Sequence, residues 1–245
     1  MEFESQSKEL VITKHEKHWV FTLNRPEKRN ALSATLVEEM IAGIAEAECK
    51  QIPLIVFMGE GKNFCAGFDF TGYESASEGD LLLRFVRIET LLQKIAYSSC
   101  LTMAMAHGSN FGAGADIIAS CKVRIATTDS KFRMPGLKFG LVLGTGRLAR
   151  LIGNENARSL LQTTRMFNAQ EAEDLGFITA QIDQHHWEGV IDQNIEIATS
   201  LPLSSRKRLY GITSELDKAN DDMAALVISA SEPGIKDRIR KFRSG

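Results

Sequence analysis

The sequence has few cysteines, and their spacing does not suggest a metal site. Its 245 residues include only four, and no Cys-x-x-Cys pair occurs. In a reducing compartment, scattered cysteines are small core residues. The adjacent histidines His185 and His186 would point in different directions on a helix or strand, so they could not chelate one ion from one face. We therefore expect no metal. The four cysteines are Cys49, Cys65, Cys100 and Cys121.

An excess of one charge is also absent. The chain has 29 Lys and Arg against 31 Asp and Glu, which gives a formal net charge of -2. No basic bias favours nucleic acid or an anionic membrane. The N-terminal "MEFESQSKEL" lacks the basic start and apolar centre of a signal peptide, and no apolar run approaches the length of a membrane span. We expect a cytoplasmic protein that binds neither nucleic acid nor membrane.

The chain does have enough apolar residues for a sizeable core, at 44% of its length. Residues 9–24 predict two short strands around a polar turn, because they are rich in valine, isoleucine and aromatic residues. Ser33 begins a helical pattern that continues to Cys49, with apolar residues on one face. The segment "PLIVFMG" (53–59) is too short for a helix and predicts a buried strand.

The alternation continues beyond this strand. We expect a helix over residues 80–96, a strand over 101–106 and, after a glycine-rich turn, a helix from about Gly112 to Ser120. Such an order is typical of α/β layers with parallel strands. The remainder is predicted to be mostly helical. We divide the chain into a core of residues 1–199 and a C-terminal helical region of residues 200–245.

Two loops share an unusual composition. "FCAGFD" (64–69) and "FGAGAD" (111–116) each leave a predicted strand through small residues and enter a helix. A turn of this kind directs free backbone N–H groups to one spot, and a helix N-terminus adds partial positive charge there. Two such loops together could hold an oxyanion. Alternatively, glycine and alanine only allow close packing of helix and strand.

Five sequence blocks together resemble the crotonase superfamily, the enoyl-CoA hydratase and isomerase family. They are "FTLNRPEKRNALS", "GEGKNFCAGFDF", "AHGSNFGAGADIIASCKVRIAT", "FRMPGLKFGLVLGTGRLARLIG" and "NAQEAEDLGFI", in the order and spacing typical of that family. The resemblance implies an α/β crotonase-like spiral of repeated ββα units, with a helical C-terminal trimerisation region. It also implies an acyl-CoA thioester substrate, no cofactor beyond the coenzyme A of that substrate, and a homotrimer or hexamer.

The resemblance implies specific catalytic groups. The thioester oxygen would lie between the backbone N–H groups of Phe68 and Ala113, where charge builds up as the enolate forms. Asp116 occupies the position of the first of two glutamates in hydratases, and Gly136 the position of the second. The chain therefore resembles the family in its oxyanion site but lacks one acid needed for hydration. We expect isomerase-, decarboxylase- or hydrolase-like chemistry rather than efficient hydration.

Asp116 has a second interpretation. An aspartate in the first turn of a helix often complements the helix dipole and bonds backbone amides, which would lower its pKa. A working base in an apolar acyl pocket would instead have its pKa raised by desolvation. The direction of its pKa shift therefore distinguishes the two roles.

The resemblance also implies substrate contacts outside the catalytic groups. These are Asn30, Ala31, Leu32, Ala66, Gly67, Asp69, Phe70, Gly112 and Gly136. Four further side chains near the pocket could supply a proton or a charge, although arginines at this spacing on a helix more often form a solvated face. They are Tyr73, Arg84, Arg87 and Arg133. His107 we interpret as structural. The basic run "KDRIRKFR" near the C-terminus either ends a helix or meets CoA phosphates.

Two alternatives remain from other classes. The missing acid at residue 136 would suit a non-catalytic acyl-CoA-binding protein on the same fold. The pattern Gly144-x-Gly146-x-x-Ala149 follows an apolar run and resembles a dinucleotide-binding turn, which would suit an NAD-dependent dehydrogenase. That pattern lacks an acid near residue 166 to bind a ribose hydroxyl, so it is the weaker alternative.

Overall fold

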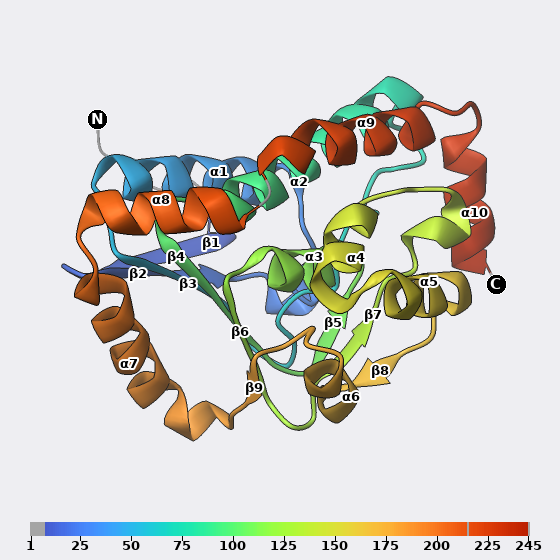
Figure 1. Cartoon of the computed structure of the whole chain (residues 1–245). Coiled ribbons are helices and arrows are strands. Elements are labelled where there is room, and N and C mark those ends of the chain that lie inside the picture. The colour runs from blue at the N-terminus through green and yellow to red at the C-terminus, as the bar shows by residue number, and fades with distance from the viewer. Residues whose placement is uncertain (1–7, 215, 245) are drawn as a thin grey trace.

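A six-stranded sheet forms the centre of the computed structural model, which describes residues 8–214 and 216–244 (Figure 1). The strand order is β1-β2-β3-β4-β6-β9, with β1 antiparallel to β2 and the others parallel. The strands are β1 (Leu10–Lys14), β2 (His18–Leu23), β3 (Leu54–Gly59), β4 (Leu101–Ala106), β6 (Val123–Ala126) and β9 (Ala180–Gln181). A second sheet pairs β5 (Ser109–Phe111), β7 (Lys131–Arg133) and β8 (Phe167–Asn168).

Helices surround both sheets. They are α1 (Ala34–Cys49), α2 (Glu78–Ala96), α3 (Ala113–Ser120), α4 (Thr145–Ile152), α5 (Asn154–Thr163), α6 (Ala169–Asp174), α7 (Trp187–Ser200), α8 (Leu203–Thr213), α9 (Ala219–Ala230) and α10 (Ile235–Ser244). Short 3₁₀ turns are η1 (Pro26–Lys28), η2 (Gly136–Phe139), η3 (Gln184–His186) and η4 (Leu216–Lys218). No described helix is both long and apolar enough to cross a membrane. The cytoplasmic location remains a prediction.

The middle strands of the large sheet are covered on both faces. Along β3, Leu54 and Val56 pack in a cluster with Trp187 of α7, whereas Ile55 and Phe57 belong to the main core with α1, α2 and α3. Successive side chains of a strand point to opposite faces, so a strand covered on both sides must be apolar at every position. This explains why residues 53–59 form an uninterrupted apolar run.

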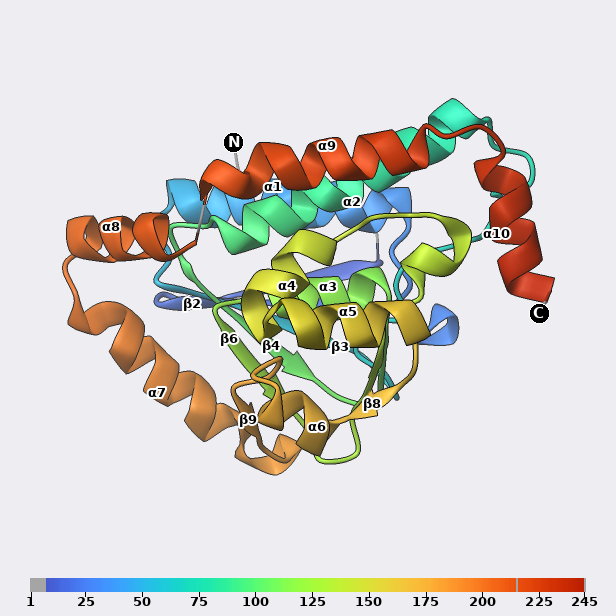
Figure 2. The ribbon, with the colours of Figure 1, turned by 45° about the vertical axis from the view of Figure 1, so that its right-hand side comes forward.

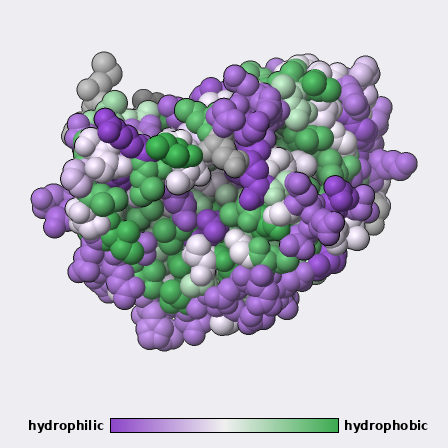
Figure 3. Space-filling model, viewed as in Figure 1, coloured by the Kyte–Doolittle hydropathy of each residue, from purple (hydrophilic) through white to green (hydrophobic). Residues whose placement is uncertain are grey.

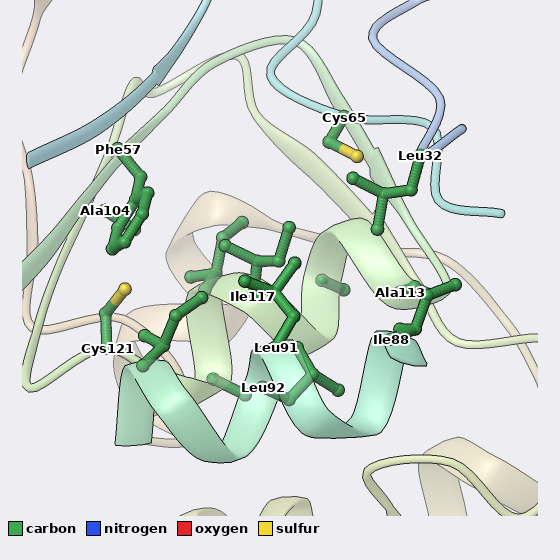
Figure 4. Packing of buried hydrophobic residues seen from close by; sticks show 14 of the residues in the cluster. Leu32, Phe57, Cys65, Ile88, Leu91, Leu92, Ala104, Ala113, Ile117 and Cys121 are labelled. Carbon is green, nitrogen blue, oxygen red and sulfur yellow. The ribbon is translucent and has the colours of Figure 1, made fainter. Parts of the chain in front are cut away.

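Helix α3 lies in the middle of the main core. All eight of its residues are buried, between the sheet and α2. Figure 4 shows Ile117 of α3 among Leu91 and Leu92 of α2, with Ala113 at the start of α3 near Ile88. A helix buried on all sides needs small and apolar residues, and this one reads "AGADIIAS". Asp116 is its one charged residue.

The C-terminal helices pack on the rest of the chain. Helix α9 lies along α2 and α4, and α10 lies against η2 (Figure 2). Their buried residues belong to the same apolar cluster as the main core, namely Leu226, Ala230, Ile235 and Ile239. Helices α9 and α10 therefore share a core with the earlier part of the chain.

Some elements differ from the sequence-based expectation. Helix α2 begins at Glu78 rather than residue 80, because Ser77 and Asp80 form a capping box. Several strands were not predicted within the segment expected to be mostly helical, and β5 was not predicted within the glycine-rich turn. These strands, β5 to β9, have two to four residues each. Such short segments show no periodicity that a sequence pattern could reveal.

Candidate active site

The two glycine-containing loops lie side by side. The first loop (64–69) follows β3, and the second loop (111–116) runs from β5 into α3. The amide of Phe111 donates to the carbonyl of Cys65 at 3.1 Å, and Leu32 N donates to Gly67 O at 2.7 Å. These backbone bonds fix the first loop between the chain before α1 and the second loop.

Gly67 allows the loops to come this close. Its φ is +89°, a conformation that favours glycine. A Cβ at this position would lie 2.4 Å from Phe111 O and 3.2 Å from Ala113 N. Any other residue would therefore push the two loops apart.

Two backbone N–H groups of these loops are free. Within residues 8–214 and 216–244, neither the amide of Phe68 nor that of Ala113 has a protein acceptor. Ala113 is the first residue of α3, so its N–H has no partner inside the helix, and the positive end of the helix dipole lies there. Both residues line the same pocket. The pair is available to an oxygen of a bound ligand.

That pocket is almost wholly apolar, with about 620 Å³ of empty space including its open mouth. Among its described lining residues, only Asp116 and Thr145 carry polar side chains. Six phenylalanines form much of its wall: Phe68, Phe70, Phe85, Phe111, Phe139 and Phe242. Neighbouring rings touch, as for Phe68 and Phe85 with ring centres 4.6 Å apart. The pocket suits an apolar chain, and its lining includes one ionisable polar group.

Asp116 supplies that polar group. Its side chain is 3% exposed, and its Oδ1 is buried without a hydrogen-bond partner. Burial raises the pKa of the carboxyl well above its ordinary value; the charge of Arg147 opposes this rise and that of Glu89 adds to it. A carboxyl that merely capped the helix would bond amides and have a lowered pKa. A raised pKa is the direction expected of a base in an acyl pocket.

Gly136 also lines the pocket but offers no side chain to it. A Cβ there would lie 3.1 Å from Leu141 O, so a side chain at this position requires Leu141 to shift by a few tenths of an ångström. In the wild-type pocket, Asp116 is the only carboxyl among the described lining residues.

Only some of the predicted substrate contacts line the pocket. Ala66, Phe70, Gly112 and Gly136 do. Asn30 does not, because its amide group donates to the carbonyls of Glu60 and Asn63 and accepts from Arg25 N. The others, Ala31, Leu32, Gly67 and Asp69, also lie outside the lining, where Leu32 and Gly67 join the loops by their backbones. Contact of these positions with a substrate stays a prediction.

The four further candidates also have partners elsewhere. Arg84 stacks on Phe68 with its guanidinium carbon 4.3 Å from the ring centre, and it donates to Asp69 O at 2.6 Å. Arg87 pairs with Glu38 at the surface, Arg133 donates to Thr164 O, and Tyr73 packs against Phe70. His107 lies 2.9 Å from Gly61 O through its Nε2. None of them lines the pocket, so each is placed to support the structure around it.

The sequence reasoning missed two parts of the site. Phe242 of α10 lines the pocket and lies with its ring centre 5.2 Å from that of Phe139. Arg147 of α4 is buried and pairs with Glu89 of α2 at 2.8 Å. An amphipathic pattern indicates that α10 packs somewhere, but it does not indicate against what. A single arginine in a helix gives no signal of burial.

The dinucleotide-binding alternative lacks its required local structure. Gly144 begins α4, but η2 and a loop precede it rather than a strand. A dinucleotide-binding turn needs a strand directly before the glycine turn and helix. Gly144 instead lies against Asp116, since a Cβ there would be 2.0 Å from Oδ1.

Comparison with known proteins gives a consistent result. The family model for enoyl-CoA hydratase/isomerase matches residues 14–237. The chain is 31% identical over 216 residues to a Mycobacterium bovis protein provisionally named enoyl-CoA hydratase echA6, covering 85% of this chain and 84% of that protein. It is also 31% identical over 169 residues to the enoyl-CoA isomerase/hydratase fer4 of Mycosarcoma maydis, covering 64% of this chain and 62% of fer4.

A crystal structure from Bordetella parapertussis is also similar. The protein is provisionally named enoyl-CoA hydratase/isomerase, and it is 51% identical to this chain. The match covers 98% of this chain and 100% of the other, with a TM-score of 0.96. The similarity extends through the C-terminal helices.

Proposed function

The chain is an enzyme of the enoyl-CoA hydratase/isomerase family, within the crotonase superfamily and with the predicted crotonase-like fold, and on this premise we propose that it binds an acyl-CoA thioester and stabilises its enolate. The observation that carries the proposal is the position of two free N–H groups beside one unpaired carboxyl in an apolar pocket. The amides of Phe68 and Ala113 would bind the thioester oxygen. Donors preorganised toward developing charge are usually the largest catalytic contribution.

Asp116 is proposed as the acid/base. Its carboxylate would take a proton from a carbon next to the thioester or conjugated with it, and the electron pair would move to the carbonyl oxygen between the two amides. The protonated Asp116 could return the proton to a different carbon, which moves a double bond. One carboxyl is sufficient for this isomerisation, and an enolate formed at the same oxyanion site would also serve decarboxylation. Within this proposal no resident cofactor is needed, since coenzyme A is part of the substrate.

Efficient hydration is not proposed. Addition of water needs one group to orient and deprotonate the water and usually another to deliver a proton, and such groups contribute typically about 10²–10⁴-fold. Gly136 supplies neither, and aspartate is shorter than glutamate by one carbon–carbon bond, about 1.5 Å. A small misplacement can itself cost about 10²-fold.

Two assays of one protein sample test the proposal. We expect exchange of acyl-CoA protons with D₂O, measured by mass spectrometry, and crotonyl-CoA hydration slower by several orders of magnitude than in two-glutamate relatives. The double variant Gly136→Glu with Asp116→Glu should raise hydration. Fast wild-type hydration would contradict the assignment of Asp116 and Gly136. Tight CoA-ester binding without exchange, over a broad panel of thioesters, would instead support the non-catalytic alternative.

We also propose that the chain forms a trimer or a dimer of trimers. Six large apolar side chains are exposed on α7, on α8, on the turn between these two helices, on η4 and on α9. They are Ile197, Leu201, Leu209, Ile212, Leu216 and Ile228. Figure 3 shows apolar residues over the part of this face that α7 and α8 cross. Exposed apolar patches often mark interfaces between subunits. A stable monomer at micromolar concentration in light scattering would contradict the proposal.

A further inference from the structure

Asp116 interacts electrostatically with a group of buried charged side chains that do not line the pocket. The group consists of Glu89 on α2, Arg147 on α4 and Asp222 on α9, and together with Asp116 on α3 we call it the charge cluster. Arg147 donates from Nη2 to Glu89 Oε1 at 2.8 Å and lies 3.8 Å from Asp222 Oδ2. Its side chain is 8% exposed and that of Glu89 is 1% exposed. The helices that carry these residues pack on one another.

The charge cluster is incompletely hydrogen-bonded. Arg147 Nε and Nη1, Glu89 Oε2 and Asp116 Oδ1 are all buried without a partner. Buried charged groups in proteins are normally paired and fully bonded, because leaving one unsatisfied is costly. Arg147 thus donates to Glu89 through one nitrogen, and its two other nitrogens have no hydrogen-bond acceptor. Asp116 Oδ1 in the same cluster has no donor.

The other polar and charged groups around the cluster have partners of their own. Arg150 of α4 pairs with Asp222, and Gln93 of α2 donates to both Glu89 Oε1 and Ala219 O. Tyr97 at the end of α2 interacts with Arg147 and Glu89 at longer range. On α3 itself, Asp116 is the one charged residue. With Asp116 protonated, two arginines balance Glu89 and Asp222. Ionising Asp116 adds one uncompensated negative charge.

We propose that Arg147 is a positioning residue for Asp116: its guanidinium, held by Glu89, keeps a positive charge near the carboxyl so that Asp116 can ionise inside an apolar pocket. Glu89 acts in the opposite sense, since it neutralises part of that charge and fixes where the guanidinium lies. The proton affinity of Asp116 therefore depends on the balance between these two buried side chains. This inference rests on the proposed function of Asp116 as the acid/base.

Gly144 supports the arrangement. A Cβ at this position would lie 2.0 Å from Asp116 Oδ1, so the carboxyl occupies space that only glycine leaves open. Arg147 follows three residues later on the same helix, one turn away. The start of α4 thus provides both the space for the carboxyl and the cation that interacts with it.

The two charge-removing variants should have opposite effects. Arg147→Gln leaves Asp116 and Glu89 without the cation, and we expect the titration of Asp116 to move up by about one pH unit. Glu89→Gln removes the competing anion, and we expect the titration of Asp116 to move down by a similar amount. Arg147→Lys keeps the cation and should restore a titration near that of the wild type. If the Arg147–Glu89 ion pair were purely structural, both variants would lose stability, and the titration of Asp116 would not move in opposite directions.

The measurement is a pH titration of ¹³C-labelled aspartate carboxyls by NMR, with Asp116→Asn used to assign the signal. Arg165→Gln is the matched control, because Arg165 pairs with Glu171 at the surface and should leave the titration unchanged. If Arg147→Gln does not fold, Glu89→Gln alone decides: a downward displacement supports the proposal, and no change or an upward one overturns it.

Activity then separates this proposal from the proposed function. We expect the acid limb of the proton-exchange profile to move with the NMR titration in each variant. Opposite NMR displacements in a protein that exchanges no substrate proton would leave the role of Arg147 intact and contradict the acid/base role of Asp116. Normal exchange in all variants with an unmoved titration would overturn the role of Arg147 alone.

Discussion

The two glycine-containing loops have nearly the same sequence, yet their aspartates lie in opposite environments. Asp69 of the first loop pairs with Arg25 at 2.9 Å and accepts from Thr71 N at 2.8 Å. Burial raises the pKa of this carboxyl, but its bonds to Thr71 and Arg25 outweigh burial and lower it overall. Asp116 of the second loop has no such bonds, and burial raises its pKa. Each loop thus ends in an aspartate at the same position, and the hydrogen-bond and ion-pair partners around that aspartate determine its role.

The largest expected effect distinguishes these two aspartates by activity. Asp116→Asn should reduce proton exchange by about 10²–10⁴-fold, because a positioned base is lost. Asp69→Asn should instead reduce stability by about 1–3 kcal/mol, because Arg25 loses its buried charged partner. Exchange assays and urea unfolding on both variants check this. A loss of exchange in Asp69→Asn as large as in Asp116→Asn, with the fold intact, would remove the distinction between the loops.

A smaller effect concerns the amide that the second loop contributes. Ala113→Pro removes its N–H, and we expect exchange to fall by about 10²–10³-fold. Proline is tolerated at the first position of a helix, which Ala113 occupies, so the fold should persist. Ala113→Gly keeps the donor and serves as the control. Full activity of the proline variant would mean that the second loop supplies no donor to the oxyanion.

The smallest effect is on how stability depends on pH. The pKa of Asp69 is lower in the folded protein, so its stabilisation is present above the pKa of the unfolded chain and is lost as pH falls through the folded value. The pKa of Asp116 is higher in the folded protein, so stability falls as pH rises from the unfolded to the folded value.

Urea unfolding over a pH series measures both contributions. We expect Asp69→Asn to flatten the acid side of the profile, and Asp116→Asn to remove the decline above the unfolded pKa. Parallel profiles for the two variants would contradict the opposite pKa directions.

The sequence predicted the fold well where patterns were long. The helices α1 and α2 and the strands β3 and β4 follow from apolar periodicity, and the start of α1 from capping by Ser33. Strands of two or three residues, such as β8, carry no such pattern. The family resemblance predicted the fold and the family as a whole.

The candidate site was less predictable. The small residues of the two loops indicated where the site lies. The structure explains the glycine at position 67, because a Cβ there would lie too close to Phe111 of the second loop. The contribution of Phe242 and the burial of Arg147 depend on tertiary packing between distant helices. No local pattern distinguishes a buried arginine from a solvated one.

A crystal structure with an unreactive acyl-CoA analogue tests the central claim most directly. The account predicts a thioester oxygen roughly 2.7–3.1 Å from both Phe68 N and Ala113 N, with the acyl chain among the phenylalanines and its α-carbon facing Asp116. An acyl group bound outside this pocket, or a thioester oxygen that accepts from neither amide, would contradict it.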